Sequence, residues 1–484
     1  MPTYKQELIY GIFWSAVEKY SGLIVSIIVS MILARILSPE EYGVIAIATV
    51  FINFLQMFCT VGIGPAVIQK DLSQEDLDSI YTFSLILGII CSSIFIGASW
   101  TIADFYNTSE LKPVCQILSI QVLFSAINMV PNALMAKNKK FKEIAKRTLI
   151  LQISSSILSI IAAYKGFGIY ALLISPVISS LGIFFWNKIY INIHINWKLQ
   201  TKSIKKIFSY SLYQFLFEFI NYFSRNIDKL IIGRLMSIDE LGIYEKSYRL
   251  MQLPIQNISA VINPVLQPIL RNLQDDKQSL SNKYIKIIKF VATISFPIGI
   301  ILACMAKETI YIFFGDKWEA AVPIFKILAL SLPLQMILST SGSIYLISNN
   351  TKMQFWLGIR NTITTLIGFL IASFYFKTLI AMAWAWTITL IINFIITFWL
   401  MYQYIFNESI LSVLKILIKP IITSIILAII LICIDIILPI DNIAIATIIK
   451  GTIAISVTLF SIQVLKQYNL MQIIKDKIKH KYPK

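Results

Sequence analysis

The sequence predicts an all-α membrane protein that crosses the bilayer many times. Of its 484 residues, 57% are apolar and only 14% are charged, whereas soluble domains average about 45–50% apolar and about 25% charged residues. The mean hydropathy is +0.75. Apolar runs close to the ~20 residues that one transmembrane helix needs recur along the whole chain. Because these runs are continuous and do not alternate with polar residues, they favour helices over a β-barrel.

Fourteen apolar runs are separated by polar loops, so we expect 14 transmembrane helices. The runs at 148–164 and 207–233 are the weakest, the second because it carries four charges. The first run contains Glu18 and Lys19 and no cleavage site follows it, so we expect it not to be a signal peptide. The expected spans are 11–34, 43–67, 79–101, 114–136, 148–164, 168–187, 207–233, 244–270, 287–306, 321–347, 356–376, 379–401, 418–439 and 444–465.

The distribution of Lys and Arg over the loops predicts the orientation. With the N-terminus placed inside, the inside segments hold 27 Lys and Arg and the outside loops hold 7. Cytoplasmic loops collect basic residues, so this split predicts cytoplasmic N- and C-termini. It also explains most of the net charge of +17, which therefore does not indicate nucleic-acid binding. The basic tail 466–484 is expected to lie on the membrane surface.

An internal repeat predicts two lobes. The segments 34–43 and 233–242 follow the first and seventh spans at a constant offset of 199 residues, and four positions are identical: Arg35 and Arg234, Ser38 and Ser237, Glu41 and Glu240, Gly43 and Gly242. In each copy we expect a tight outer turn, in which the Ser and the acids start the next helix and the Gly permits the bend. Six spans between the copies imply a parallel repeat about an axis along the membrane normal.

The repeat gives the expected domain organisation. The N-terminal lobe of six helices would cover 1–200 and the C-terminal lobe of six helices 201–405. The remaining residues, 406–484, would hold spans 13 and 14 and the basic cytoplasmic tail.

Enzymatic and metal chemistry is not expected. The five cysteines are scattered in apolar stretches and the two histidines stand apart, so neither a disulfide framework nor a metal site is predicted. No nucleotide-binding or hydrolase motif is present. We therefore expect no cofactor and no catalytic residue.

Charges inside the spans predict a hydrated cavity. A charge at the centre of a span costs at least ~2.5–3.5 kcal/mol on insertion scales, yet spans 7 and 8 each carry a polar stripe at helical spacing. The excess of cations beside neutral amides suits an anionic ligand such as phosphate and sugar. The candidate substrate-binding residues are Lys19, Asn53, Arg225, Lys229, Arg249, Gln252 and Gln256, and their acidic partners are Glu18, Glu218, Asp228 and Glu245.

A structural alternative stays open for each charge. Arg225 with Asp228, and Glu245 with Arg249, are spaced to form ion pairs within one helix. Lys246 and Arg360 are expected near span ends, where their side chains would reach toward the interface. Lys326 and Arg360 enter the expected cavity from the C-terminal lobe.

Three segments carry a resemblance to a known family. The segments Tyr244–Ile258, Leu33–Gly43 and Phe314–Pro323 resemble the corresponding regions of bacterial flippases for O-antigen and exopolysaccharide repeat units. These flippases belong to the multidrug/oligosaccharidyl-lipid/polysaccharide (MOP) exporter superfamily. The resemblance extends over nearly the whole chain and does not indicate which glycan is carried.

The resemblance implies a function and a location. It implies a two-lobe transporter of the bacterial inner membrane that works by alternating access. The substrate would be an undecaprenyl-diphosphate-linked oligosaccharide, moved to the outer leaflet for lipopolysaccharide, capsule or exopolysaccharide biosynthesis. Membrane lipid is the other expected partner, and H+, Na+ or the membrane potential could drive the movement.

The sequence leaves two other functions as alternatives. A multidrug or cation antiporter of the same superfamily would prefer a cavity with acidic excess, which spans 7 and 8 do not have. A membrane glycan polymerase or ligase would carry a large outer loop with catalytic residues, and the expected outer loops are short.

Overall fold

The computed structural model describes residues 4–60, 63–196, 219, 222–223, 225–438, 440–465 and 467–468. The chain falls into two compact units, Met1–Gly242 and Ile243–Lys484. The predicted lobe boundary at residue 200 lies in a segment outside the described residues, so the predicted domain limits stay a prediction.

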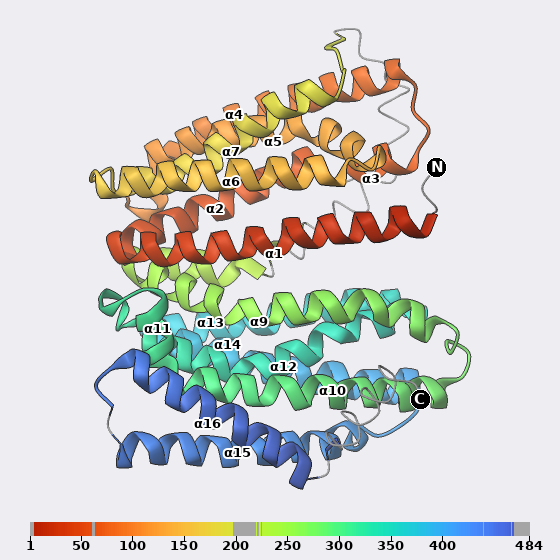
Figure 1. Ribbon diagram of the computed structural model, residues 1–484, viewed down its shortest axis with the longest axis vertical. Coiled ribbons are helices and arrows are strands. Elements are labelled where there is room, and N and C mark those ends of the chain that lie inside the picture. The colour runs from red at the N-terminus through yellow and green to blue at the C-terminus, as the bar shows by residue number, and fades with distance from the viewer. Residues whose placement is uncertain are drawn as a thin grey trace, which may run out of the picture. The chain divides into compact units, whose positions relative to one another are not determined.

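The regular structure of the first unit is helical in its described part. Its helices are α1 (Tyr4–Ile36), α2 (Pro39–Thr60), α3 (Ile63–Gln69), α4 (Gln74–Tyr106), α5 (Leu111–Lys137), α6 (Phe141–Tyr164) and α7 (Tyr170–Tyr190), followed by a helical stretch at 225–235. Within this unit α6 packs against α1 and α7, and α5 packs against α2, α4 and α7 (Figure 1).

The second unit is built in the same way. Its helices are α9 (Ile238–Arg271), which begins in the first unit, α10 (Lys277–Cys304), α11 (Ala306–Phe313), η1 (Asp316–Trp318), α12 (Ala321–Ile347), α13 (Thr351–Ile371), η2 (Ala372–Phe376), α14 (Leu379–Met401), η3 (Tyr402–Phe406), α15 (Leu411–Ile437) and α16 (Ile443–Val464). Here α10 packs against α12 and α15, α14 against α12 and α13, and α15 against α16.

The all-α membrane fold is confirmed. Twelve helices within the described residues are long and apolar enough to cross a membrane, and they match twelve of the predicted runs. The predicted run 207–233 lies largely outside the described residues. The run 244–270 is the helix α9, which has 34 residues and carries too many polar side chains to meet the same apolarity test. The count of fourteen spans therefore stays a prediction.

Several helices begin before their apolar runs, at polar residues that cap them. At the start of α4, the Ser73 hydroxyl accepts from the backbone N–H of Asp76 while the Asp76 carboxylate accepts from the backbone N–H of Ser73. This reciprocal capping box satisfies two amides that the helix leaves free. At the start of α10, Asp276 accepts from the backbone N–H of Ser279 at 3.0 Å. Hydrogen bonds from Ser279 also lower the pKa of the Asp276 carboxyl.

The two copies of the repeat turn have the same local structure. The Ser38 backbone N–H donates to Glu41 at 2.7 Å, and the Glu41 backbone N–H donates to the Ser38 hydroxyl at 3.3 Å. In the second copy, the Ser237 backbone N–H donates to the Glu240 carboxylate at 3.0 Å, and the Glu240 backbone N–H donates to the Ser237 hydroxyl at 3.1 Å. Both turns are therefore capping boxes that start the next helix, α2 and α9, as the repeat predicted.

Candidate substrate-binding site

The helical stretch 225–235 brings three of the candidate charges onto one segment. Arg225 is exposed, Lys229 is half-buried and Asp228 is 1% exposed. One Asp228 oxygen accepts from the backbone N–H of Lys229 at 2.8 Å. The guanidinium of Arg225 is thus accessible, as is that of Arg234 at the other end of the segment, while the Asp228 carboxylate is enclosed by protein. Glu218, the predicted acidic partner, lies outside the described residues.

Aromatic packing holds the same segment against α2. The Phe54 ring lies 5.8 Å from that of Phe219 and 5.4 Å from that of Phe223, measured between centroids. The Tyr222 hydroxyl donates to the backbone carbonyl of Val50. Asn53, the candidate amide on α2, is exposed beside this contact region. Since Asn53 precedes Phe54 in the chain, the aromatic contacts place an exposed amide near the helix that carries Arg225.

The two candidates on α1 differ in their surroundings. Glu18 is half-buried and accepts from the Thr148 hydroxyl at 2.9 Å, which ties α1 to α6. Lys19 is exposed. The Glu18 carboxylate is thus hydrogen-bonded to α6, while the Lys19 ammonium is accessible.

The candidate polar residues on α9 fall into two groups, which are exposed or half-buried. Arg249 and Gln256 are exposed, and Glu245 and Gln252 are half-buried. The Gln252 amide donates to the Tyr248 hydroxyl at 3.0 Å and to Gln335 on α12 at 3.1 Å. The helical spacing predicted in the sequence therefore does present a guanidinium and an amide together on one accessible face.

Arg360 lies farther from a span end than the sequence indicates, whereas Lys246 is the ninth residue of α9 and stays near its start. Lys246 is 4% exposed, and its ammonium lies 5.0 Å from the centroid of the Phe314 ring. Arg360 is the tenth residue of α13, because that helix begins at Thr351 rather than near 356. The loop residues before 356 extend the helix, which moves Arg360 toward its middle.

A buried polar network in the first unit was not predicted. Arg147, one of the 27 basic residues that the sequence places on the inside, lies in α6 and is 5% exposed. Its guanidinium donates to Asn132 on α5 at 2.9 Å and to Asn187 on α7. The Asn187 amide in turn donates to Asn128 at 3.1 Å and to Asn132 at 3.0 Å. The spacing of Asn128 and Asn132, one helical turn apart, was the signal in the sequence.

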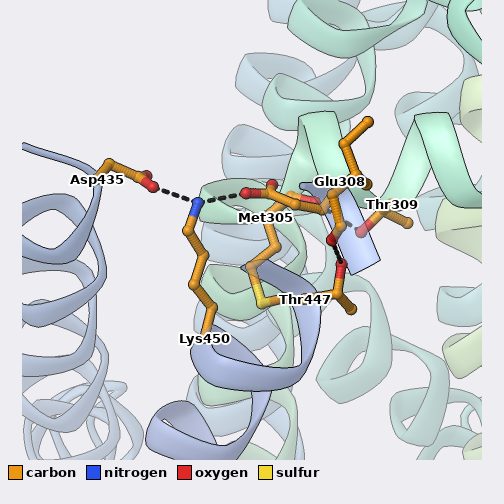
Figure 2. Close-up of polar contacts among 7 residues, drawn as sticks. Met305, Glu308, Thr309, Asp435, Thr447 and Lys450 are labelled. Carbon is orange, nitrogen blue, oxygen red and sulfur yellow. Dashed lines mark hydrogen bonds and ion pairs between the residues drawn. The ribbon is translucent and has the colours of Figure 1, made fainter. Parts of the chain in front are cut away.

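A second network was also missed. The Lys450 ammonium lies between the carboxylates of Glu308 and Asp435, joining α16 to α11 and α15 (Figure 2). The side chains of Lys450 and Glu308 are 7% and 10% exposed. One cation is thus shared by two acids, of which Glu308 is buried and Asp435 is partly exposed. Within the described residues, no group of three or more His, Cys, Asp or Glu side chains is arranged to hold a metal ion.

The chain is similar to proteins of bacterial polysaccharide biosynthesis. Residues 32–323 match the family described as "Polysaccharide biosynthesis protein". The teichuronic acid biosynthesis protein TuaB of Bacillus subtilis is 27% identical over 83% of this chain and 83% of its own length. The lipopolysaccharide biosynthesis protein WzxC of Escherichia coli is 23% identical over 74% of this chain and 73% of its own. The succinoglycan biosynthesis transport protein ExoT of Rhizobium meliloti is 24% identical over 66% and 65%.

Solved structures share the fold. The lipid II flippase MurJ in an inward closed conformation superposes with a TM-score of 0.70, at 16% identity, over 94% of this chain and 98% of that one. A multidrug resistance transporter of the MATE family in the MOP superfamily, in an inward-facing conformation, gives a TM-score of 0.60 at 15% identity, over 84% and 98%. At these identities the similarity establishes the fold alone.

Proposed function

We infer that this chain, which belongs to the Polysaccharide biosynthesis protein family, is a flippase for lipid-linked oligosaccharides in a cell membrane. The observation that carries this conclusion is the agreement of family and fold over most of the chain. The protein moves its substrate between leaflets and makes or breaks no bond in it. The predicted place in the MOP superfamily agrees with the same relatives.

The finer assignment of the substrate starts from the accessible cations. Arg225 and Arg249, with Lys19 and Lys229, would hold the diphosphate of an undecaprenyl-diphosphate-linked oligosaccharide, because a guanidinium binds phosphate oxygens with two parallel hydrogen bonds. The exposed amides of Gln256 and Asn53, and the half-buried amide of Gln252, would form hydrogen bonds with the sugar hydroxyls. In this proposal transport proceeds by alternating access.

The membrane potential supplies a driving force in this scheme. With cytoplasmic termini, movement to the outer leaflet carries about two negative charges away from an inside-negative cytoplasm. Each charge that crosses 100 mV gains ~2.3 kcal/mol. Counter-charges of the protein that move with the substrate reduce this gain, and exchange with H+ or Na+ is the alternative source of energy.

A cation antiporter is the second candidate, since a MATE transporter shares the fold. Cation binding requires accessible carboxylates. In the described part of the two candidate segments, Asp228 is buried and Glu245 half-buried, whereas Arg225 and Arg249 are exposed. The accessible charge is thus of the sign that repels a cationic drug, which favours the flippase.

The proposal is tested with purified protein in liposomes. A fluorescent undecaprenyl-diphosphate oligosaccharide is placed in both leaflets, and the fraction accessible to a membrane-impermeant quencher is followed. Transfer should be faster than in protein-free liposomes, and it should respond to an imposed potential. Transport of a lipophilic cation against a proton gradient, without transfer of the lipid-linked sugar, would identify an antiporter instead.

A further inference from the structure

A run of hydrogen bonds joins α9 to α12 inside the second unit. The Gln252 amide nitrogen on α9 donates to the Gln335 amide oxygen on α12 at 3.1 Å, and the Gln335 nitrogen donates to the Ser331 hydroxyl at 2.8 Å. Ser331 is 1% exposed, whereas Gln252 and Gln335 are half-buried. The run therefore begins within the packed helices and ends at the accessible side of α9 that carries Arg249.

The hydrogen of the Ser331 hydroxyl sets the direction of every bond in this run. That hydroxyl donates to the Leu328 backbone carbonyl at 2.6 Å, so it can only accept from Gln335, because a hydroxyl has one hydrogen. Gln335 must then turn its nitrogen to Ser331 and its oxygen to Gln252. The two ends of an amide differ in their hydrogen-bonding role, and one orientation alone satisfies the run, with the Gln252 nitrogen toward α12.

A second contact between the same two helices has the same polarity. The Ser339 hydroxyl of α12 donates to the Met336 carbonyl at 2.7 Å. In its 2.9 Å contact with the Ser259 hydroxyl of α9, the hydrogen therefore comes from Ser259. At both contacts α12 supplies the acceptor and α9 the donor, which supports the orientation of Gln252.

Both hydrogens of the Gln252 amide nitrogen are used within the protein. The second one goes to the Tyr248 hydroxyl at 3.0 Å, on the same helix. The Tyr248 ring is held by an edge contact with Trp386 of α14, at 5.2 Å between centroids. The Gln252 oxygen accepts no hydrogen bond from the described part of the chain. Gln252 therefore offers a ligand an acceptor and no donor.

The neighbours of Gln252 on α9 place this acceptor beside a cation. At 100° per residue, the exposed residues Arg249 and Gln256 lie within about 60° of Gln252 around the helix. Arg249 is three residues away, roughly 4.5 Å along the axis at 1.5 Å per residue. When a phosphate of the substrate contacts the Arg249 guanidinium, the group that reaches the Gln252 oxygen belongs to the sugar bonded directly to that phosphate.

We propose that Gln335 is a positioning residue that holds the Gln252 oxygen toward the substrate, so that the site selects a sugar with a hydroxyl or amide N–H donor next to the diphosphate. This inference rests on the proposed function and deepens it, because it concerns how the carried sugar is recognised. Gln335 itself touches no ligand in this scheme. A site built to hydrogen-bond one group discriminates against an analogue that lacks it, since the polar group of the site is then left unpaired.

The selection is measured in the liposome transfer assay with two synthetic probes. One is an undecaprenyl-diphosphate monosaccharide with a free hydroxyl on the carbon next to the anomeric carbon, and the other carries fluorine in its place. Fluorine is similar in size to a hydroxyl and has no hydrogen to donate. The unmodified chain should transfer the hydroxyl probe about fivefold to tenfold more efficiently, as kcat/KM, than the fluorinated probe.

Variants on α12 separate positioning from packing. Gln335→Met removes the partner of Gln252 at similar volume, and Ser331→Ala keeps that partner while removing the acceptor that fixes its direction. Both should lower the ratio between the probes to about twofold or less, by raising KM for the hydroxyl probe while the fluorinated probe is transferred as before. Ser339→Ala is the matched control, because it breaks the bond to Ser259 between the same helices and should leave the ratio unchanged.

The remaining outcomes separate this inference from the function on which it rests. Equal transfer of both probes by the unmodified chain would refute the positioning role and leave the flippase function standing. Transfer of the fluorescent oligosaccharide but of neither probe would likewise refute it, whereas transfer of none of the three would refute the flippase function. If Gln335→Met and Ser339→Ala slow both probes to the same extent, these contacts only hold the helices together. If Gln335→Met does not fold, Ser331→Ala decides, since it keeps the bond between the helices.

Discussion

Gly43 and Gly242 make reciprocal backbone contacts. A Cβ atom added to Gly43 would overlap the carbonyl oxygen of Ile238, and one added to Gly242 would overlap the carbonyl oxygen of Pro39. Each carbonyl belongs to the residue four positions before the opposite glycine. This is the exchange of contacts that a two-fold axis between two equal turns requires. The internal repeat is therefore expressed as a physical contact between its two copies.

Replacing either glycine by alanine should disrupt this contact. The nearest atoms are backbone, which cannot rotate away, so we expect each substitution to lower the free energy of unfolding by about 1–3 kcal/mol and to reduce transfer. Thermal unfolding in detergent and the liposome assay measure the two effects. Gly97→Ala on α4 is the control, because a Cβ there meets nothing within 4 Å. Unchanged stability and transfer in Gly43→Ala would show that the turns separate at no cost.

Removing the Lys450 ammonium should destabilise the second unit. Lys450→Met leaves the Glu308 and Asp435 carboxylates without their shared cation, and losing one partner of a buried pair costs about 3–5 kcal/mol. The thermal midpoint should fall clearly, while Lys317→Met at an exposed position should leave it unchanged. The triple variant with Glu308→Gln and Asp435→Asn should recover much of the loss. A triple variant no more stable than Lys450→Met would show that Lys450 acts through packing.

Cysteine labelling tests the orientation. Single cysteines at Asn107 and Asp239 should react with an impermeant thiol reagent added outside intact cells, whereas those at Asn138 and Gln278 should react only after lysis. All four positions are exposed, so a missing signal cannot come from burial. The natural Cys433, which is also exposed, is first changed to Ser. The opposite pattern would reverse the cytoplasmic placement of the termini that the distribution of Lys and Arg predicts.

The guanidinium groups of Arg225 and Arg249 should contribute more to transfer than their positive charge alone would. Arg225→Ala or Arg249→Ala should slow transfer roughly tenfold to a hundredfold, as expected when a hydrogen bond to a charged group is lost. Arg→Lys at either position should retain only part of the transfer rate, because lysine keeps the charge and lacks the planar guanidinium. Glycan export and membrane protein level are measured together. An active Arg225→Ala/Asp228→Ala double variant would show that Arg225 only balances Asp228.

The sequence predicted features that depend on neighbours along the chain. Thirteen apolar runs are helices, and both Ser-x-x-Glu turns are capping boxes, because these structures are decided within a few residues. Helix ends were less predictable. The Ser73 capping box starts α4 five residues before the expected run, since a helix does not stop where the membrane does.

Pairings over long distances could not be predicted. Arg147 reads as one of several basic residues after a span, and only the fold brings Asn132 and Asn187 around it. Lys450 and Glu308 are 142 residues apart, and no local pattern joins them. Among the candidate site residues, Arg249 and Gln256 lie two helical turns apart on α9 and both are exposed, whereas no local pattern indicates that Glu18 accepts a hydrogen bond from Thr148.

The two π-helical turns at the ends of α14 have a consequence for bilayer thickness. The turn η2 before it presents Tyr375, 83% exposed, and the turn η3 after it presents Tyr404, 62% exposed. Aromatic rings of this kind settle at the level of the lipid headgroups. The 28 residues Leu379–Phe406 extend roughly 42 Å at 1.5 Å per residue, close to the ~40–45 Å of a bilayer with its headgroups. The helix is therefore anchored at both faces, and a thinner bilayer must tilt it rather than let it slide.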